Sequence, residues 1–210
     1  MATLRKIFLM PYFGSLPEWY DKFELPKGYD ILLDQDLEGF KKRVKDKLGI
    51  DYPGLEGSGK PWDYRATLGL LYEDEIKGYD FYGHTDFDCV YGDVDKWVSD
   101  EFLAELDVHS NHNTYVMGAW TLYRNVPEVR ELFKKVENWQ EYLIHPEPNG
   151  WVEKEFSRAL ESSGLRYKYT FNQGNPYTTE PNLKKENGKL YQDGVEICMF
   201  HFRRSKRWPL

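Results

Sequence analysis

Short apolar segments alternate with helix-like segments over the first 86 residues, and this order most constrains the fold. Residues 7–10, 29–34 and 79–86 are apolar or aromatic and end at Pro or Asp, as buried strands do. Residues 37–48 and 61–76 carry apolar side chains at helical spacing. The order strand, helix, strand, helix, strand predicts an α/β layer with parallel strands.

The second half of the chain continues this mixture. Residues 115–123 are expected to form a strand and residues 152–162 a helix. Residues 189–200 alternate around an Asp-Gly pair, which predicts a β-hairpin. A length of 210 residues suits one domain, so we expect residues 1–210 to form a single α/β domain.

Charge and cysteine content limit the classes of protein to consider. The net charge of −7 indicates no overall basic surface, which argues against nucleic-acid binding as the main function. Cys89 and Cys198 lie in apolar runs, so we expect free buried thiols in a reducing compartment, although a bridge between them is an alternative. No run approaches the ~20 apolar residues of a membrane span. We therefore expect a soluble, cytoplasmic protein.

The strongest chemical signal is the pair Asp86 and Asp88, which follows the third predicted strand. In an extended segment, residues i and i+2 point to the same side, so both carboxylates can meet at one point. Two adjacent carboxylates repel unless a cation lies between them, and Mg²⁺ or Mn²⁺ is the usual ion. The alternative is a solvated, aspartate-rich turn. The position at the carboxyl end of a strand favours a metal that bridges to a diphosphate.

Basic and imidazole groups near the C-terminus are candidates for the same site. His201 follows the predicted hairpin, and a neutral imidazole is a good third ligand for Mn²⁺. Lys206 and the neighbouring arginines can pair with phosphate oxygens. The alternative is a partly buried histidine followed by a frayed basic tail.

Candidate nucleotide contacts come from the first half of the chain. The loop after the first strand carries Tyr12, Phe13 and Gly14, which can supply backbone hydrogen bonds and aromatic stacking. Asp34 follows the second strand and can accept from a base or ribose. Arg65 precedes the aspartate pair and can face phosphates. Ordinary turn chemistry and a solvated charge are the alternatives.

Two further polar groups are less specific. Glu153 lies in the first turn of a predicted helix, where the helix dipole favours acids, so capping and a positioned general base are both possible roles. Residues 109–113 hold two histidines, which hint at a metal or at the edge of a pocket.

The motif-bearing segments resemble a known group of enzymes. Residues 77–93 (KGYDFYGHTDFDCVYGD) resemble the pattern KGYDFWGYxDxDxxxGD of a bacterial and phage family of glycosyltransferases with a GT-A-like fold. The opening strand with its Tyr-Phe-Gly loop, residues 118–125 (GAWTLYRN) and the closing His-Phe pair match in the same order. The resemblance spans most of the chain, and its aspartate segment is the specific part.

This resemblance implies a GT-A-like, Rossmann-related mixed sheet flanked by helices. Residues 1–95 would form the nucleotide-sugar-binding half, and residues 96–210 the acceptor-side half with a C-terminal metal-site tail. GT-A enzymes hold a divalent ion against the donor diphosphate, which implies Asp86, Asp88 and His201 as ligands. The chain departs from the pattern at 152–153, where Val-Glu replaces an expected Asp-Glu pair, and this leaves Glu153 as the nearer acceptor-side acid.

The sequence thus predicts an enzyme that transfers a sugar from a nucleoside-diphosphate sugar, with UDP as the expected nucleotide, to a hydroxyl acceptor. Glu153 and Asp88 would be the catalytic acids. The acceptor would be a surface glycan or a hydroxymethylated base in phage DNA. A metal-dependent phosphohydrolase or nuclease and a non-catalytic nucleotide-sugar-binding protein remain alternatives.

Overall fold

The computed structural model describes residues 3–116, 118–175, 177–178 and 182–202. The strands are β1 (Lys6–Pro11), β2 (Tyr29–Asp34), β3 (Phe81–Thr85), β4 (Cys89–Tyr91), β5 (Val108–Ser110), β6 (Trp120–Arg124), β7 (Tyr167–Tyr169), β8 (Leu183–Glu186), β9 (Lys189–Gln192), β10 (Val195–Ile197) and β11 (Met199–His201). The α-helices are α1 (Leu37–Leu48), α2 (Leu68–Leu71), α3 (Asp100–Ala104), α4 (Pro127–Arg130), α5 (Trp139–Ile144) and α6 (Ser157–Glu161). Short 3-10 helices span Tyr20–Lys22, Lys60–Thr67, Val94–Lys96 and Leu132–Lys135, and a π-helix spans Val152–Phe156.

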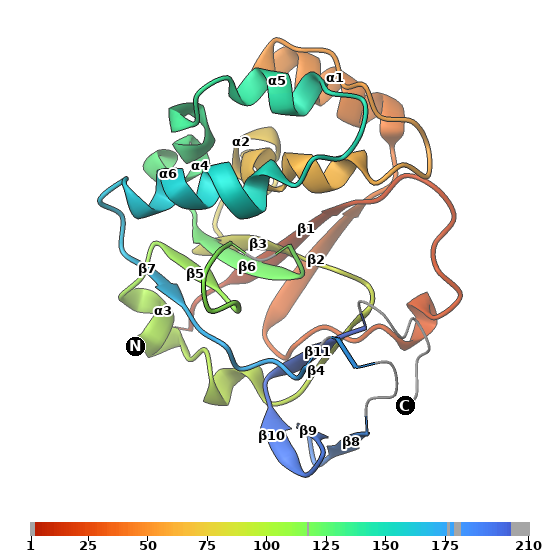
Figure 1. Cartoon of the computed structure of the whole chain (residues 1–210), viewed down its shortest axis with the longest axis vertical. Helices are drawn as coiled ribbons and strands as arrows, with labels where there is room; N and C mark the ends of the chain where they lie inside the picture. The colour runs from red at the N-terminus through yellow and green to blue at the C-terminus, as the bar shows by residue number, and fades with distance from the viewer. Residues whose placement is uncertain (1–2, 117, 176, 179–181, 203–210) are drawn as a thin grey trace.

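A mixed six-stranded sheet forms the centre of the molecule, in the order β2-β1-β3-β6-β5-β7. Strands β1, β2 and β3 pair in parallel, as predicted, while β6 runs antiparallel to both β3 and β5. Helices α1, α2, α4, α5 and α6 gather on one side of this sheet, and α3 lies on the other (Figure 1). The predicted α/β class with a mixed sheet flanked by helices is confirmed.

Each central strand contributes side chains to two separate hydrophobic cores, because its side chains alternate between the two faces of the sheet. Ile7 and Leu9 of β1 point to the helical side, whereas Phe8 packs on the opposite face with Trp120. Both faces are covered, so the strands are buried along nearly their whole length, as expected for the parallel part of an α/β sheet.

Helix α1 begins and ends at the predicted residues. The side chain of Asp36 accepts a hydrogen bond from the backbone N–H of Gly39 at 2.9 Å and caps the first turn. Gly49 then adopts a left-handed conformation with φ of 73° and ends the helix. Local capping signals therefore determine this element.

The single helix predicted over residues 61–76 is wrong. The segment begins as a 3-10 helix, continues as the single turn of α2 and ends in turns. Buried side chains such as Lys60, Asp63 and Thr67 surround the 3-10 helix instead of forming one apolar stripe. Its conformation therefore follows tertiary contacts, which override helical spacing.

Two other predicted elements are also shorter or divided in the structure. The strand expected over residues 115–123 is confined to β6, and the helix expected over residues 152–162 divides into a π-helix and α6. Strand β5, which overlaps the polar segment 109–113 at residues 109 and 110, was not predicted.

The C-terminal hairpin is confirmed as β9 and β10. Asp193 and Gly194 both have positive φ, 51° and 80°, as a tight two-residue turn requires. A second turn of this kind, at Asn187 and Gly188, adds β8 to form a three-stranded sheet. This small sheet projects away from the central one (Figure 1).

Both cysteines are free and buried, as expected, and no bridge joins them. Among the described residues, no helix is long and apolar enough to cross a membrane.

A buried histidine in β5 makes stability sensitive to acid. Burial lowers the pKa of His109 to about 4, whereas an unfolded histidine titrates near about 6.5. As the pH falls, the unfolded chain therefore binds a proton at this histidine before the folded chain does. The free energy of unfolding is unaffected by His109 above pH ~6.5 and decreases as the pH falls toward 4. We expect a loss of about 3 kcal/mol from this residue over that interval.

Denaturant unfolding of the wild type and of His109→Gln between pH 7 and pH 4 measures this loss. Glutamine at position 109 does not titrate, so the free energy of unfolding of the variant should fall less steeply with decreasing pH than that of the wild type. Equal slopes for the two proteins would contradict the assignment.

Candidate functional site

The turn between β3 and β4 presents both aspartates of the predicted pair. Strand β3 ends at Thr85, and Asp86 and Asp88 follow directly. Strand β11 pairs antiparallel with β4 and places His201 opposite Cys89. The backbone N–H of Phe202 also donates to the carbonyl of Asp88 at 2.8 Å. The C-terminal strand thereby carries an imidazole to the carboxylates.

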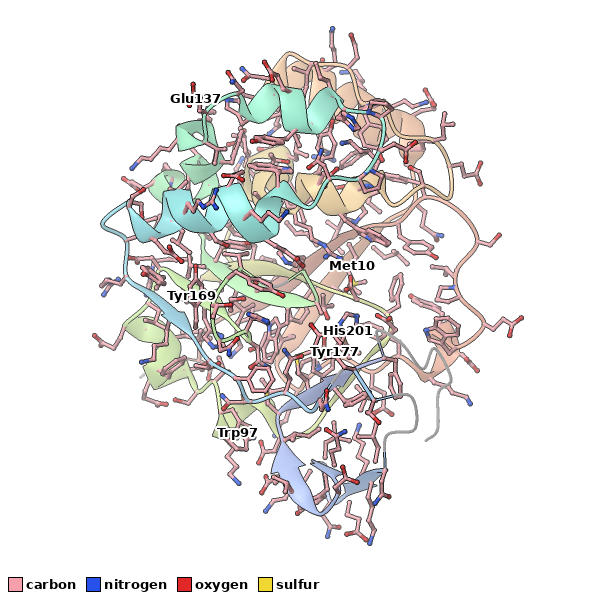
Figure 2. The ribbon with its side chains drawn as sticks, viewed as in Figure 1. Met10, Trp97, Glu137, Tyr169, Tyr177 and His201 are labelled. Carbon is pink, nitrogen blue, oxygen red and sulfur yellow. The ribbon has the colours of Figure 1, made fainter. Side chains whose placement is uncertain are left out.

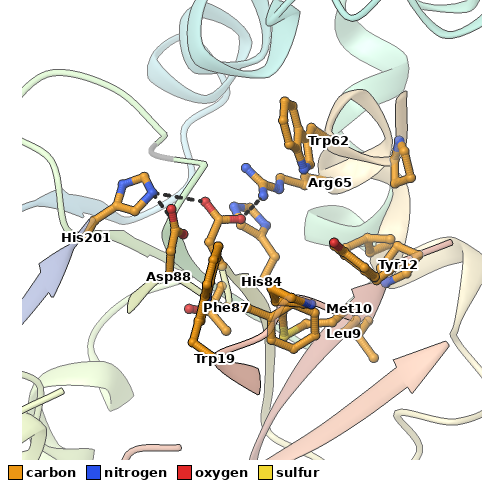
Figure 3. A pocket seen from close by; sticks show the side chains of 16 residues that line it. Leu9, Met10, Tyr12, Trp19, Trp62, Arg65, His84, Phe87, Asp88 and His201 are labelled. Carbon is orange, nitrogen blue, oxygen red and sulfur yellow. Dashed lines mark hydrogen bonds and ion pairs between the residues drawn. The ribbon is translucent and has the colours of Figure 1, made fainter. Parts of the chain in front are cut away.

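His201 lies beside both carboxylates: its Nε2 is 3.3 Å from Asp88 Oδ1, as Figure 3 shows, and 3.6 Å from Asp86 Oδ2. The edge of an octahedron around Mg²⁺ or Mn²⁺ measures about 3 Å, given metal–oxygen distances of about 2.1 Å. Ligand atoms of Asp88, Cys89 and His201 lie within 4.8 Å of one another, whereas Asp86 is outside that group. Asp86 must therefore move inward to share one ion with Asp88 and His201.

Burial and mutual charge shift the pKa values of the three groups. Burial raises the pKa of Asp86, and the positive charges of Arg65 and His201 offset this only in part. Burial also acts on Asp88, but the hydrogen bond and charge of His201 outweigh it and lower the pKa. Burial disfavours protonated His201, yet the hydrogen bond to Asp88 and the two carboxylates raise its pKa. The cluster thus attracts a proton or another cation to the same place.

Cys89 Sγ lies in a group with Asp88 and His201 whose ligand atoms are within 4.8 Å of one another. Burial and the nearby carboxylates raise the pKa of this thiol, so it stays protonated, and its Sγ lies 3.8 Å from the Ala119 carbonyl oxygen. Two carboxylates and one imidazole remain as donors. This set fits Mn²⁺ or Mg²⁺ better than a thiolate-preferring ion.

Arg65 pairs with the outer side of Asp86. It projects from the 3-10 helix Lys60–Thr67, and its Nη2 donates to Asp86 Oδ1. Gly118 makes room for it, because a Cβ at that position would collide with Nη1 of Arg65. A Cβ atom placed on Gly118 would also lie 3.5 Å from Oε1 of Glu153. Gly118 therefore permits a guanidinium and a carboxylate to approach each other beside the aspartates.

The larger of two pockets at this site has a volume of about 460 Å³. Apart from His201, its lining comes from the first half of the chain: Leu9, Met10, Pro11, Tyr12, Pro17, Trp19, Pro61, Trp62, Arg65, Leu68, His84, Thr85, Asp86, Phe87 and Asp88. Aromatic rings of Trp62, Tyr12, Trp19 and Phe87 stand around the opening (Figure 3). The side chain of Trp62 is 58 % exposed, so a flat ring is available for stacking.

A second, smaller pocket of about 130 Å³ adjoins the first. It shares Arg65, Asp86 and His201 with the first pocket and adds residues from the second half of the chain: His112, Tyr115, Gly118, Ala119, Glu153, Phe171, Gln173 and Tyr177. Figure 2 shows Tyr177 and His201 close together, at the point where the second half of the chain meets the site.

The structure brings together most of the residues predicted from the sequence. Tyr12 and Arg65 line the larger pocket, and Glu153 lines the smaller one. Glu153 lies in a π-helix, a conformation that occurs frequently at functional sites. Lys206 lies outside the described residues.

Three predicted nucleotide contacts lie elsewhere. Phe13 is buried in the helical-side core, with its ring 5.1 Å from that of Phe40. Gly14 faces Gly57, and Asp34 accepts a hydrogen bond from the hydroxyl of Tyr72 at 2.5 Å. None of the three is among the described residues that line the larger pocket.

Sequence reasoning missed the aromatic residues around both pockets. Trp62 and Phe171 lie in segments without a recognisable motif, and only the high aromatic content of 17 % hinted at such surfaces. Of residues 109–113, His112 does line a pocket, whereas His109 is buried behind it.

Comparison with known proteins gives one match. The model of a family of unknown function, DUF6625, matches residues 31–199. This match covers most of the chain, which therefore belongs to that family. No curated protein matches it.

Proposed function

For this member of the DUF6625 family, we propose a metal-dependent glycosyltransferase that moves a sugar from a nucleoside-diphosphate sugar to a hydroxyl acceptor. One observation carries the proposal: Arg65, Asp86 and His201 line two pockets at once. A reaction that joins two substrates needs such an arrangement, in which charged groups face both partners at their meeting point.

The larger pocket is the proposed donor site. Its aromatic rim, with Tyr12 and Trp62, offers stacking surfaces for a base or sugar. Asp86, Asp88 and His201 would hold Mn²⁺ or Mg²⁺ at its inner end, and a bound ion supplies positive charge to the donor diphosphate. We propose a UDP-sugar as the donor and the cytoplasm of a bacterium or infected host cell as the location, in keeping with two free buried thiols.

Arg65 supports the departure of the diphosphate. Negative charge develops on the phosphate oxygens as the bond to the sugar breaks, and a prepositioned cation lowers the energy of that state. The Arg65 guanidinium is tethered to Asp86 at the junction of the pockets, so it is held where this charge appears. Arg65 thus orients the phosphates and stabilises the leaving group.

Glu153 is the proposed general base. Its carboxylate lines the smaller pocket, lies near Arg65 and is not among the described residues that line the donor pocket. There it would take the proton of the acceptor hydroxyl while that oxygen attacks the anomeric carbon and the diphosphate leaves.

Replacing Glu153 by Gln should lower the transfer rate by about 10²–10⁴-fold, since a positioned base contributes about that factor. Donor binding should stay within about twofold of the wild type, because Glu153 is absent from the described lining of the donor pocket. Steady-state transfer rates and a separate donor-binding titration measure the two effects. Glu155→Gln is the matched control, since Glu155 bonds Arg158 at the surface. Unchanged transfer by Glu153→Gln would contradict the role of the base.

The acceptor dependence of product release distinguishes the proposal from its rivals. The protein, Mn²⁺ and a panel of nucleotide-sugars are incubated with and without methyl glycosides and an oligonucleotide containing 5-hydroxymethylcytosine. Acceptor-dependent release of nucleoside diphosphate, with a new glycosidic product, is the expected result. Equal release without any acceptor would indicate a hydrolase, and donor binding without turnover would indicate a binding protein.

A further inference from the structure

The smaller pocket has aromatic walls that are unusually open to solvent. Phe171 is 53 % exposed and Tyr177 is 51 % exposed, although large apolar rings are normally buried. The rings of His112 and Tyr115 stack with centroids 3.6 Å apart, and Phe171 meets His112 edge-on at 6.4 Å. Clustered exposed rings in a concave site are characteristic of ligand surfaces.

The segment that carries Phe171 is held in place before any ligand arrives. The backbone N–H of Asn172 donates to Asn111 Oδ1 at 2.9 Å, and Gln173 Nε2 donates to the Asn111 carbonyl at 3.1 Å. Asn111 is buried and directly precedes His112. The side chain and the backbone carbonyl of Asn111 thus hold the residues next to Phe171 beside His112, so a ligand would lose little affinity to ordering this wall.

The charges of the smaller pocket suit a neutral ligand. Arg65 is the only lysine or arginine among the described lining residues, and it is already paired with Asp86. Glu153 adds a negative charge. Nucleic acid carries a phosphate for every nucleotide and is bound through several free lysines and arginines. A modified DNA base would bring phosphates toward carboxylates here.

A sugar ring matches these features. The face of an aromatic ring carries partial negative charge, and the C–H groups on one face of a pyranose carry partial positive charge. The ring hydroxyls of the same sugar can donate to Glu153. The pocket, at about 130 Å³, is much smaller than the donor pocket of about 460 Å³, as a single ring at the end of an acceptor requires.

We infer that the smaller pocket is the acceptor subsite and that it binds the terminal pyranose of a glycan between Phe171 and Tyr177, with a hydroxyl directed at Glu153. The role of this pocket as an acceptor subsite rests on the proposed glycosyltransferase function. The binding of a sugar at the pocket can, however, be measured without any donor. The acceptor is then a carbohydrate and not a base in DNA.

The test is saturation-transfer NMR with methyl pyranosides of glucose, galactose, mannose and N-acetylglucosamine, and with a duplex containing 5-hydroxymethylcytosine. At least one glycoside should receive saturation at its ring C–H protons. Phe171→Ala and Tyr177→Ala should each weaken that glycoside about tenfold. Tyr167→Ala is the matched control, because Tyr167 is a partly exposed tyrosine absent from the described linings of both pockets. Thermal unfolding of each variant checks that it is folded.

Three results would overturn the inference: no saturation of any glycoside, equal glycoside binding by wild type and the two pocket variants, or Phe171-dependent binding of the modified duplex alone. A parallel titration of UDP with Mn²⁺ separates this inference from the proposed function. Nucleotide binding without glycoside binding removes only the acceptor subsite. Phe171-dependent glycoside binding without nucleotide binding supports a sugar site and contradicts the transferase.

Discussion

Asp88→Asn should abolish metal-dependent binding of the nucleotide-sugar and lower transfer by at least about 10³-fold. Asp88 Oδ1 lies 3.3 Å from His201 Nε2, at the centre of the proposed metal site. An amide of the same shape keeps a hydrogen bond to the imidazole but loses the negative charge that attracts the ion. The retained hydrogen bond should keep the metal-free variant folded, which thermal unfolding checks. Calorimetric titration with Mn²⁺ and UDP measures the binding.

Asp93→Asn is the control for this experiment. Asp93 belongs to the same acidic segment, but it is exposed and is not among the described residues that line either pocket. It should bind Mn²⁺ and UDP like the wild type. If Asp88→Asn also binds them with unchanged affinity, the two aspartates do not hold a metal.

Asp63→Ala should destabilise the fold by about 3–5 kcal/mol, since removal of one partner leaves a buried charge without compensation. Asp63 and Lys60 form an ion pair at 2.8 Å with side chains 2 % and 0 % exposed. The Asp63 carboxylate also accepts from the backbone N–H groups of Asn149 and Gly150. These bonds connect the 3-10 helix of Arg65 to the loop that precedes Glu153. Denaturant unfolding measures the loss.

A matched surface pair shows whether burial is the cause. Lys77 and Asp74 are also separated by three residues and lie 2.7 Å apart, but their side chains are 76 % and 65 % exposed. Asp74→Ala should leave the free energy of unfolding nearly unchanged. Similar losses for Asp63→Ala and Asp74→Ala would contradict the argument from burial.

The parts of the fold that follow from local patterns could be predicted from the sequence. Helix α1 has its own capping residues, and the first three strands are short apolar runs between breakers. The segment around Asp63 could not be predicted, because its conformation depends on contacts with residues about 80 positions away, such as the bond from Lys60 Nζ to the Tyr142 carbonyl. Helical spacing carries no information on such partners.

In the candidate site, too, some residues could be predicted from local sequence and others depend on long-range contacts. Asp86 and Asp88 are separated by one residue, so the sequence already placed them in one segment, but both lie in the turn after β3 and not in the extended strand that was predicted. His201 reaches them only because β11 pairs with β4; its role was proposed from its residue type after the predicted hairpin, and the family resemblance strengthened it. Phe171 and Tyr177 belong to no recognisable motif. The position of Phe171 depends on long-range hydrogen bonds from Asn172 and Gln173 to Asn111, which the sequence pattern does not reveal. Phe13 lies in the predicted loop, but its ring packs in the core and not in the pocket, and the sequence does not distinguish these two places for an aromatic residue.

Thermal unfolding with UDP-, GDP-, ADP- and dTDP-sugars, each with and without Mn²⁺, tests the central claim most directly. A ligand stabilises only the state that binds it, so a donor at about 100 times its Kd adds about 2.7 kcal/mol. For a chain of this size, that corresponds to a rise in Tm of roughly 5–10 °C. We expect such a rise with one nucleotide family, only when Mn²⁺ is present, and not in Asp88→Asn. No rise with any donor, or an equal rise without Mn²⁺, would contradict a metal-dependent nucleotide-sugar site.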